Sequence, residues 1–463
     1  MRIRRLRTAL ASWIVLVTVV QCSFAPDDPG KALYQFEPIR SDYTNLRGMN
    51  YIPSYAGSSV GVWNLYDPEL VARELRHTRR LGANSVRVWL SYWSWYHEPD
   101  EFLESFRHLL ETCESLGLFL MPVLWDSCFT ENAVTDSPWL VLDTWIPCPG
   151  QDFLRQPETW DRFDPYVEAI VTEARSSPAL LIWDVMNEPV GDGTEPWLRR
   201  QIEHVRELDP DHPITIGWTG PPPVTEAGKL VDVVSYHPYG VFRENVRVRT
   251  RQAREHAEQI GGKPIIATEI GAPGWLARYE DVLRYLEEEN VGFMLFESIM
   301  HTHPKYPFRG PQGILYSDGE TRDPVGVKAF QEVTKRQGGL FDPDFAVKSK
   351  EDPLYFPYAP VNNGMGGPEL VDLMFHWDER YGTPEYPQIS PENYGLYLAA
   401  LNQVVYGLGW SDLMPDELAG LRRSIALYSG LAGQGDFEAA EEVLVGVARE
   451  AAQLMDNAEI GPQ

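Results

Sequence analysis

Apolar runs of six to eight residues recur between about residues 46 and 336, and stretches with helical spacing separate them. Short apolar runs bounded by polar segments are typical of strands that are buried on both faces, as in parallel sheets. The pattern predicts eight such strands, at residues 46–52, 84–90, 118–125, 180–187, 213–218, 231–237, 264–270 and 291–298.

The segments between these runs place apolar residues three and four positions apart, which predicts amphipathic helices, among them 68–81, 101–117 and 274–289. Asp67 followed by Pro68 is a typical helix start. Strands and helices that alternate eight times predict an α/β fold, a (β/α)8 TIM barrel. The alternative is a doubly wound open sheet, but the turn after the first run lacks the Gly-rich phosphate-binding pattern of such folds.

The character of the chain changes outside this region. We expect a lead-in at residues 26–45, the catalytic barrel at 46–338 and an irregular connector, rich in Pro, Gly and aromatic residues, at 339–392. Residues 393–463 contain three further patterns with helical spacing, which predict a small C-terminal helical appendage that packs on the barrel.

The first 25 residues have the features of a signal peptide. Four Arg lie within the first seven residues, and the apolar stretch 9–20 is short for a membrane span. Small residues around Ala25 offer a cleavage point. We therefore expect export, so that the protein is secreted or periplasmic; a retained membrane anchor or a lipid anchor on Cys22 is the alternative.

Composition narrows the possible partners. The net charge of −27 argues against nucleic acid and anionic polymers, which need basic patches. Aromatic residues make up 12% of the chain and suit the apolar faces of sugar rings, although large cores use them too. We expect a monomer without a membrane partner beyond the signal segment. In an exported protein Cys128 could form a disulfide with Cys148, whereas Cys113 fits a buried thiol, and no cysteine spacing resembles a zinc site.

Two glutamates follow apolar runs at the expected carboxyl ends of strands. Glu188 lies in the sequence Asn-Glu-Pro, where Pro189 should hold it in an extended conformation, and Glu269 lies 81 positions later. Because strand ends converge on one axis of a barrel, both carboxylates could meet there, as glycosidic bond cleavage requires. Taken singly, Asn-Glu-Pro could be an ordinary turn, and Glu269 could be an ion-pair partner.

Other strands add polar groups at the same edge. Arg87 lies inside a strand that otherwise reads as buried, and a buried Arg needs a carboxylate partner. The alternative is an Arg that is exposed at the strand tip. His237 and Tyr239 end the sixth predicted strand and add an imidazole and a hydroxyl group.

With these motifs the chain resembles the retaining glycoside hydrolases of clan A, most closely the family five cellulase and mannanase group. The resemblance covers about residues 46–336 and rests on Arg87, Asn187-Glu188-Pro189, His237-Pro238-Tyr239 and Thr268-Glu269. It implies that Glu188 is the general acid and base and that Glu269 is the nucleophile. It further implies that Asn187 binds the sugar 2-hydroxyl, that Arg87 and Tyr239 orient Glu269, and that His237 lines the site.

The chain departs from the family pattern at two strand ends. The eighth run has Phe296 where the family has a Trp under the reactive sugar, and Glu297 after it could be a third carboxylate or a buried hydrogen-bond partner. The third run ends in Trp125-Asp126, where the family often has a His. Among the aromatic residues near strand ends, Trp93, Trp125 and Phe296 are candidate sugar platforms, although some of the Trp residues should belong to the core.

The sequence therefore predicts an exported retaining β-glycoside hydrolase that cleaves a β-linked glycan of glucan or mannan type. It needs no cofactor and no metal, because carboxylates suffice for the chemistry. An exo-acting enzyme or a transglycosylase would leave the same motifs. A non-catalytic carbohydrate-binding barrel, or a scaffold whose C-terminal helices dock a partner protein, are alternatives from other functional classes.

Overall fold

The structure is a computed structural model of the chain. It describes residues 32–345, apart from 129–136, 143–144, 221–224, 240–242, 272–278 and 301–312, together with residues 398, 401 and 415–457. The predicted signal peptide lies outside the described residues, as do most of the predicted connector and most of the first C-terminal helical pattern.

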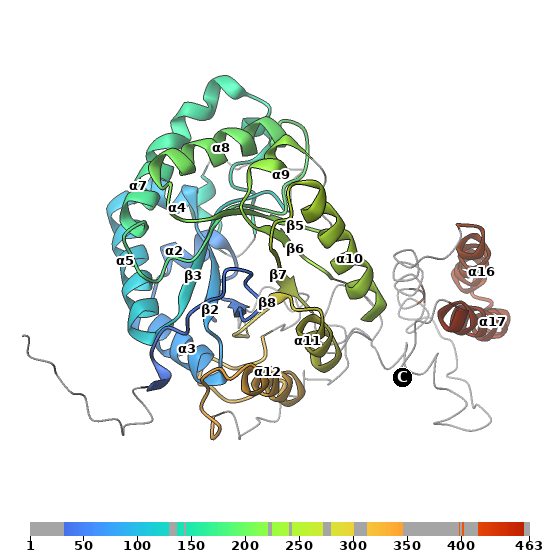
Figure 1. Cartoon of the computed structure of the whole chain (residues 1–463). Coiled ribbons are helices and arrows are strands. Elements are labelled where there is room, and N and C mark those ends of the chain that lie inside the picture. Colours follow the sequence, from blue (N-terminus) through green and yellow to red (C-terminus); the bar gives the residue numbers. More distant parts are fainter. Residues whose placement is uncertain are drawn as a thin grey trace, which may run out of the picture.

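Eight parallel strands form a closed barrel in chain order, so the predicted fold class is confirmed (Figure 1). The strands are β1 (Arg47–Asn50), β2 (Ser85–Trp89), β3 (Phe119–Asp126), β4 (Trp183–Asn187), β5 (Ile214–Trp218), β6 (Val234–Tyr236), β7 (Ile265–Ile270) and β8 (Gly292–Leu295). Seven strands fall within the predicted runs, and β3 extends one residue beyond its run, to Asp126. The barrel closes where Gly48 of β1 pairs with Met294 of β8.

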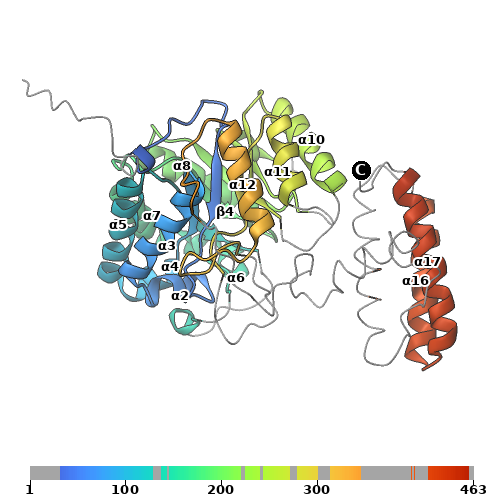
Figure 2. The same ribbon diagram turned by 90° about the horizontal axis from the view of Figure 1, so that it is seen from below.

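Helices lie around the barrel and cover its outer face (Figures 1 and 2). They are α2 (Ser59–Asn64), α3 (Pro68–Leu81), α4 (Tyr92–His97), α5 (Pro99–Leu116), α6 (Gln151–Leu154), α7 (Asp164–Ala174), α8 (Thr194–Leu208), α9 (Glu226–Leu230), α10 (Arg243–Gln259), α11 (Tyr279–Glu288) and α12 (Pro324–Arg336), with 3-10 turns η1 (Pro138–Leu140) and η2 (Pro157–Phe163). The predicted helix at 68–81 is confirmed as α3. Asp67 caps it by accepting the backbone N–H of Leu70, and Gly82 ends it with a φ of 119°, which suits glycine.

The core has two parts. Apolar residues of the helices pack against the outside of the strands in a large cluster that includes most of the buried Trp residues. A smaller cluster contains apolar side chains from six strands or the residues just before them, namely Leu46, Met121, Ile182, Val233, Ile266 and Met294. Because these strands are buried on both faces, their sequences read as apolar runs rather than as strict alternation.

Glu37, in the lead-in before β1, joins two segments that are distant in the sequence. Its carboxylate pairs with Arg47 at 2.5 Å and with Arg79 at 3.0 Å, and both guanidinium groups are buried. The same carboxylate accepts the backbone N–H of Leu340, which follows α12. The residues before the first strand and after the last barrel helix are therefore connected through one side chain.

The described C-terminal residues form two helices, α16 (Pro415–Gly433) and α17 (Phe437–Asn457), which pack against each other. They correspond to two of the three predicted helical patterns. The predicted domain limits remain predictions. Within the described residues, none of the helices is long and apolar enough to cross a lipid bilayer.

Candidate active site

Glu188 follows β4 directly and turns its side chain toward the barrel axis. Its φ is +43°, a left-handed conformation that costs a non-glycine residue roughly 1–3 kcal/mol. The expectation that Pro189 holds Glu188 extended is therefore wrong. The surrounding structure fixes the strained backbone, because its N–H donates to Gly217 O at 2.6 Å and its carbonyl accepts from Ser127 Oγ at 3.3 Å.

Glu269 projects from the end of β7 and is held by two strong donors. Nη1 of Arg87 lies 2.6 Å from Oε1, and the hydroxyl of Tyr239 donates to Oε2 at 2.7 Å. The carboxylate is 5% exposed, so these contacts form away from bulk water. Arg87 and Tyr239 thus both contact Glu269; that they orient it for catalysis stays a prediction.

The guanidinium of Arg87 connects four strands of the barrel interior. Besides Glu269, it donates to Asp184 Oδ2 at 2.8 Å, to Asn187 Oδ1 at 2.7 Å and to Asn50 Oδ1 at 3.1 Å. Burial alone would lower the pKa of Arg87, but the carboxylates of Asp184 and Glu269 raise it above its ordinary value. Arg87 is therefore permanently charged, and the interpretation of Arg87 as an exposed strand-tip residue is wrong.

Gly217 of β5 makes this packing possible. A Cβ atom at this position would lie 2.8 Å from Nη2 of Arg87 and 3.2 Å from both Asp184 Oδ2 and His237 Nε2. A glycine therefore lets the guanidinium and the imidazole approach the strand closely.

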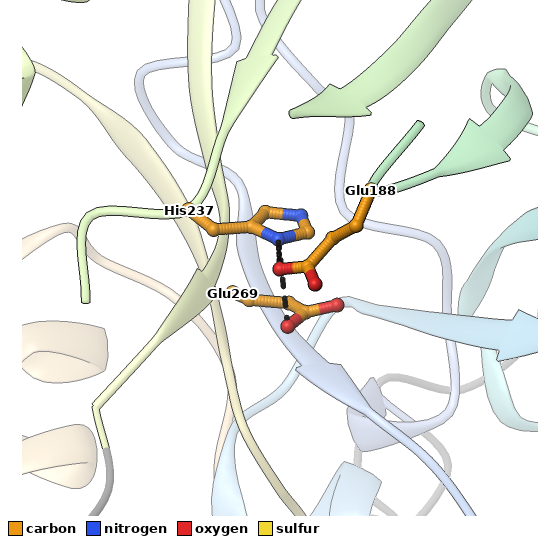
Figure 3. A group of neighbouring side chains, drawn as sticks. All are labelled: Glu188, His237 and Glu269. Atoms are coloured by element: carbon orange, nitrogen blue, oxygen red, sulfur yellow. Dashed lines mark hydrogen bonds and ion pairs between the residues drawn. The ribbon is translucent and has the colours of Figure 1, made fainter. Parts of the chain in front are cut away.

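His237 faces both glutamates with one ring nitrogen (Figure 3). Its Nδ1 atom is 2.8 Å from Oε1 of Glu188 and 3.5 Å from Oε2 of Glu269. Burial lowers the pKa of His237 to about 3; the charge of Glu269 offsets part of this effect, and Arg87 and Arg249 lower the pKa further. The imidazole is consequently neutral near neutral pH and binds as a hydrogen-bonding group rather than as a cation.

The two glutamates differ in their surroundings. Burial raises the pKa of Glu188, and its direct partners are a neutral imidazole and the thiol of Cys128. Burial also raises the pKa of Glu269, and the charge of Glu188 adds to this, but Arg87 and the hydroxyl of Tyr239 counter the increase. The guanidinium and the hydroxyl that contact Glu269 favour its ionised form, whereas the two partners of Glu188 are uncharged.

Asp126, at the end of β3, lies next to Asn187 and is hydrogen-bonded to it. It accepts hydrogen bonds from Asn187 Nδ2 at 3.3 Å, from Trp145 Nε1 at 2.5 Å and from the backbone N–H of Cys128 at 2.9 Å. Burial raises its pKa to about 6. Asp126 thus connects the site to the loop that follows β3.

The predicted aromatic platforms divide into two groups. Trp125 is 1% exposed and packs among Phe163, Tyr166 and Trp197 outside the barrel, so it is a core residue and not a sugar platform. Trp93 is also buried, and its ring nitrogen donates to Pro147 O at 3.2 Å.

Phe296, by contrast, follows β8 and is only partly buried. It meets Trp89 edge to face with ring centroids 6.1 Å apart, and Trp89 lies over the guanidinium of Arg87. Glu297 after it is buried, in agreement with its interpretation as a buried polar group.

The cysteine predictions have mixed outcomes. Cys113 is a buried thiol, as expected. Cys128 and Cys148 are both free thiols, so the possible disulfide between them is not formed. No sequence pattern predicts a thiol against Glu188, because Cys128 lies two residues beyond the end of β3.

Glu188, His237 and Glu269 also form the group of potential metal ligands found among the described residues. One ligand atom of each lies within 4.8 Å of the others. The charge of Arg87, 2.6 Å from Glu269, opposes a cation at this position. The same closeness of carboxylates instead suits chemistry in which one carboxyl group carries a proton.

A parallel barrel with two buried carboxylates at its carboxyl ends is an arrangement typical of glycosidases. Curated relatives agree with this class, although no protein-family model matches the chain. Human beta-glucuronidase is 27% identical over 238 residues, 48% of this chain and 31% of the relative. Mannan endo-1,4-beta-mannosidase 2 of Oryza sativa subsp. japonica is 24% identical over 188 residues, 30% of this chain and 42% of the relative.

The chain spans about a third of the length of the glucuronidases and about two fifths of that of the mannosidases. Among solved structures, the exo-beta-1,4-mannosidase of an Opitutaceae bacterium is 20% identical with a TM-score of 0.49 and covers 63% of this chain and 59% of its own. The endo-beta-1,4-mannanase of Thermotoga petrophila is 17% identical with a TM-score of 0.46 and covers 63% and 76%. These homologues are glycoside hydrolases; membership of family five stays a prediction.

Proposed function

We propose that this protein is a retaining β-glycoside hydrolase in which Glu188 is the acid and base and Glu269 is the nucleophile. The observation that carries the proposal is the closeness of the two carboxylates, which have oxygens within 4.8 Å of each other. Retaining enzymes place the two carboxyl groups about 5–5.5 Å apart, whereas inverting enzymes leave roughly 6.5–9.5 Å for a water molecule.

In the first step, ionised Glu269 attacks the anomeric carbon while protonated Glu188 gives its proton to the departing oxygen. In the second step, Glu188 takes a proton from water, and this water cleaves the glycosyl–Glu269 bond. The environments suit these roles. Burial favours the protonated form of Glu188, whereas Arg87 and Tyr239 favour the ionised form of Glu269.

Two further predicted site residues have supporting roles. Asn187 Oδ1 accepts from Arg87 and its Nδ2 donates to Asp126, so its amide is oriented next to the reacting sugar, where it would bind the 2-hydroxyl. Phe296 would lie under this sugar, because it is partly buried and its ring is braced by Trp89.

The substrate we propose is a β-linked glycan of glucan or mannan type, which the similarity to mannosidases supports. A net charge of −27 disfavours a polyanionic glycan. The basic and apolar N-terminal residues support export to a secreted or periplasmic location. An exo-acting enzyme would use the same two steps but recognise a chain end. A transglycosylase would use them with a sugar, instead of water, as the acceptor.

The test compares the parent protein with Glu269→Gln and with Glu258→Gln, a control at an exposed position on α10. The panel contains β-glucans, mannans, and aryl β-glycosides of glucose, mannose and glucuronic acid. We expect hydrolysis by the parent and the control but not by Glu269→Gln, and a first product with the β-configuration in proton NMR. Equal activity of Glu269→Gln would overturn the assignment of the nucleophile, and an α-configured first product would overturn retention.

A further inference from the structure

The thiol of Cys128 lies directly against the carboxyl group of Glu188. Its Sγ atom is 2.5 Å from Oε2, and Nδ1 of His237 lies 2.8 Å from Oε1. Each oxygen of this carboxyl group therefore has one uncharged partner, and the two partners come from different sides of the barrel, after β3 and after β6.

Hydrogen bonds of Ser127 and of the Cys128 backbone fix the position of this thiol, and none of them involves the thiol group. The N–H of Cys128 donates to Asp126 Oδ1 at 2.9 Å, and the N–H of Ser127 donates to Asn187 O at 3.2 Å. The hydroxyl of Ser127 bonds the carbonyl of Glu188 at 3.3 Å and accepts the N–H of Val190 at 3.1 Å. The turn after β3 is thus hydrogen-bonded to residues that precede and follow Glu188, namely Asn187 and Val190.

The strand end that carries this turn is held as well. Asp126 exchanges two backbone hydrogen bonds with Cys148, at 2.9 and 2.7 Å, and accepts the indole N–H of Trp145. Neither Ser127 nor Cys128 can move far without breaking these contacts. These contacts therefore hold the thiol in a fixed position beside the carboxyl group of Glu188.

We propose that Cys128 is a positioning residue for the acid/base glutamate, with its thiol holding Oε2 while His237 holds Oε1. This inference rests on the function proposed above. A glutamate side chain has three rotatable bonds, and an acid must keep its proton within hydrogen-bond reach of the leaving oxygen. Two partners, one on each oxygen, fix the orientation of the carboxyl plane.

The thiol also favours the ionised form of Glu188, because S–H donates to the carboxylate. Its removal would raise the pKa of Glu188 and move the alkaline limb of the kcat/KM profile to higher pH. Other titratable or charged groups that face Glu188 are unchanged by this substitution; they are Arg87, Asp126, His237, Tyr239, Arg249 and Glu269.

The experiment compares Cys128→Ala, Cys128→Ser and the control Cys113→Ala, whose thiol is buried away from the site on α5. Two aryl β-glycosides of the preferred sugar are used: a phenyl glycoside, whose leaving group needs a proton, and a 2,4-dinitrophenyl glycoside, which does not. For Cys128→Ala we expect kcat/KM to fall roughly tenfold or more on the phenyl glycoside alone, a part of the 10²- to 10⁴-fold that acid catalysis contributes. Cys128→Ser, which retains a donor, should restore most of this activity.

Methyl methanethiosulfonate provides a readout on the unmutated protein. Burial and the charge of Glu188 hold the pKa of Cys128 well above its ordinary value, so labelling is done at alkaline pH. The thiolate of Cys128 then attacks the reagent's sulfenyl sulfur, which forms a mixed disulfide and releases methanesulfinate, while the thiol proton passes to solvent. We expect selective loss of activity on the phenyl glycoside, which dithiothreitol reverses, in both the parent and Cys113→Ala.

Identical leaving-group dependence and superimposable pH profiles for Cys128→Ala and the parent would overturn the inference. Glu188→Gln separates this result from a failure of the proposed function. If Glu188→Gln loses activity on the phenyl glycoside while Cys128→Ala does not, only the role of Cys128 fails; if Glu188→Gln keeps this activity, the assignment of the acid itself fails.

Discussion

Asp184 accepts a hydrogen bond from Nε of Arg87 at 2.8 Å, and both side chains are completely buried. Oδ1 of the same carboxylate accepts the backbone N–H of Gly217 at 3.1 Å. Arg87 therefore pairs with two carboxylates: Asp184, which has a structural role, and Glu269, which is the proposed nucleophile. Without Asp184, Glu269 would have to balance the buried charge alone.

Asp184→Asn should test this division of roles. Removal of one partner of a buried ion pair is costly, and Arg87 would keep Glu269 as its remaining carboxylate partner, so we expect a loss of about 3–5 kcal/mol in the free energy of unfolding. The measurement is urea denaturation at neutral pH. Asp161→Asn removes a carboxylate that pairs with Arg200 but is 92% exposed, and it should leave stability unchanged. Equal stability of both variants would contradict the prediction.

Tyr239→Phe should shift the pH dependence of catalysis. The hydroxyl donates to Oε2 of Glu269 and so favours the ionised nucleophile; its loss raises the pKa of Glu269. The acidic limb of the kcat/KM profile should move to higher pH. A hydrogen bond to a charged group contributes about 1.5–3 kcal/mol, so kcat should fall roughly 10- to 100-fold.

Tyr236→Phe is the matched control for this prediction. Tyr236 lies three residues earlier and donates to Thr250 on α10, away from both glutamates. Its variant should retain the profile of the parent. A shift of the same size in both variants would show that the effect is not transmitted through Glu269.

Asp126 should make stability depend on pH. Its pKa is raised to about 6, above the value of about 3.9 in an unfolded chain. Between these values the folded state keeps a proton that the unfolded state has lost, so the contribution is complete below about pH 4 and disappears as pH rises through 6. Relative to Asp126→Asn, the parent should lose about 3 kcal/mol from pH 4 to pH 7, because each unit corresponds to about 1.36 kcal/mol. A difference that stays constant in urea denaturation across this range would refute the prediction.

Trp125 and Phe296 should respond differently to substitution. Phe296→Ala removes the proposed sugar platform and should raise KM with little effect on stability. Trp125→Ala removes a buried core side chain and should lower the free energy of unfolding by about 3–5 kcal/mol without a change in KM. Thermal denaturation and initial-rate kinetics on both variants distinguish the two roles. A raised KM for Trp125→Ala alone would reverse our assignment.

The barrel could be predicted from the sequence because each strand is buried on both faces and appears as an uninterrupted apolar run. Arg87 and the two strand-end glutamates stood out for the same physical reason, since charges in apolar surroundings require partners. Asp184 lies within the run 180–187 and carries the same signal, so the argument applied to Arg87 could have found it.

The sequence could not predict which side chains face the barrel interior at the ends of β3 and β4. Asp184 and Asn187 both contact Arg87 although they are three positions apart, and the pairing of β4 with β5 shifts between them. In a regular strand two such residues would face opposite sides. Asp126 pairs in register with Asn187 and points inward, whereas Trp125 pairs with Met186 and points outward into the helices. Trp125 therefore packs outside the barrel, away from the site.

The contacts of Glu37 bear on where the catalytic unit can be cut. Protein engineers often trim a barrel domain to its first strand and last helix, here Arg47 and Arg336. Such a fragment would lose the carboxylate that pairs with both buried guanidinium groups, Arg47 and Arg79, and also the carbonyl of Leu340 that accepts from Arg79. A minimal soluble fragment should therefore start before Glu37 and extend through Asp342, which pairs with Arg80 at 2.7 Å.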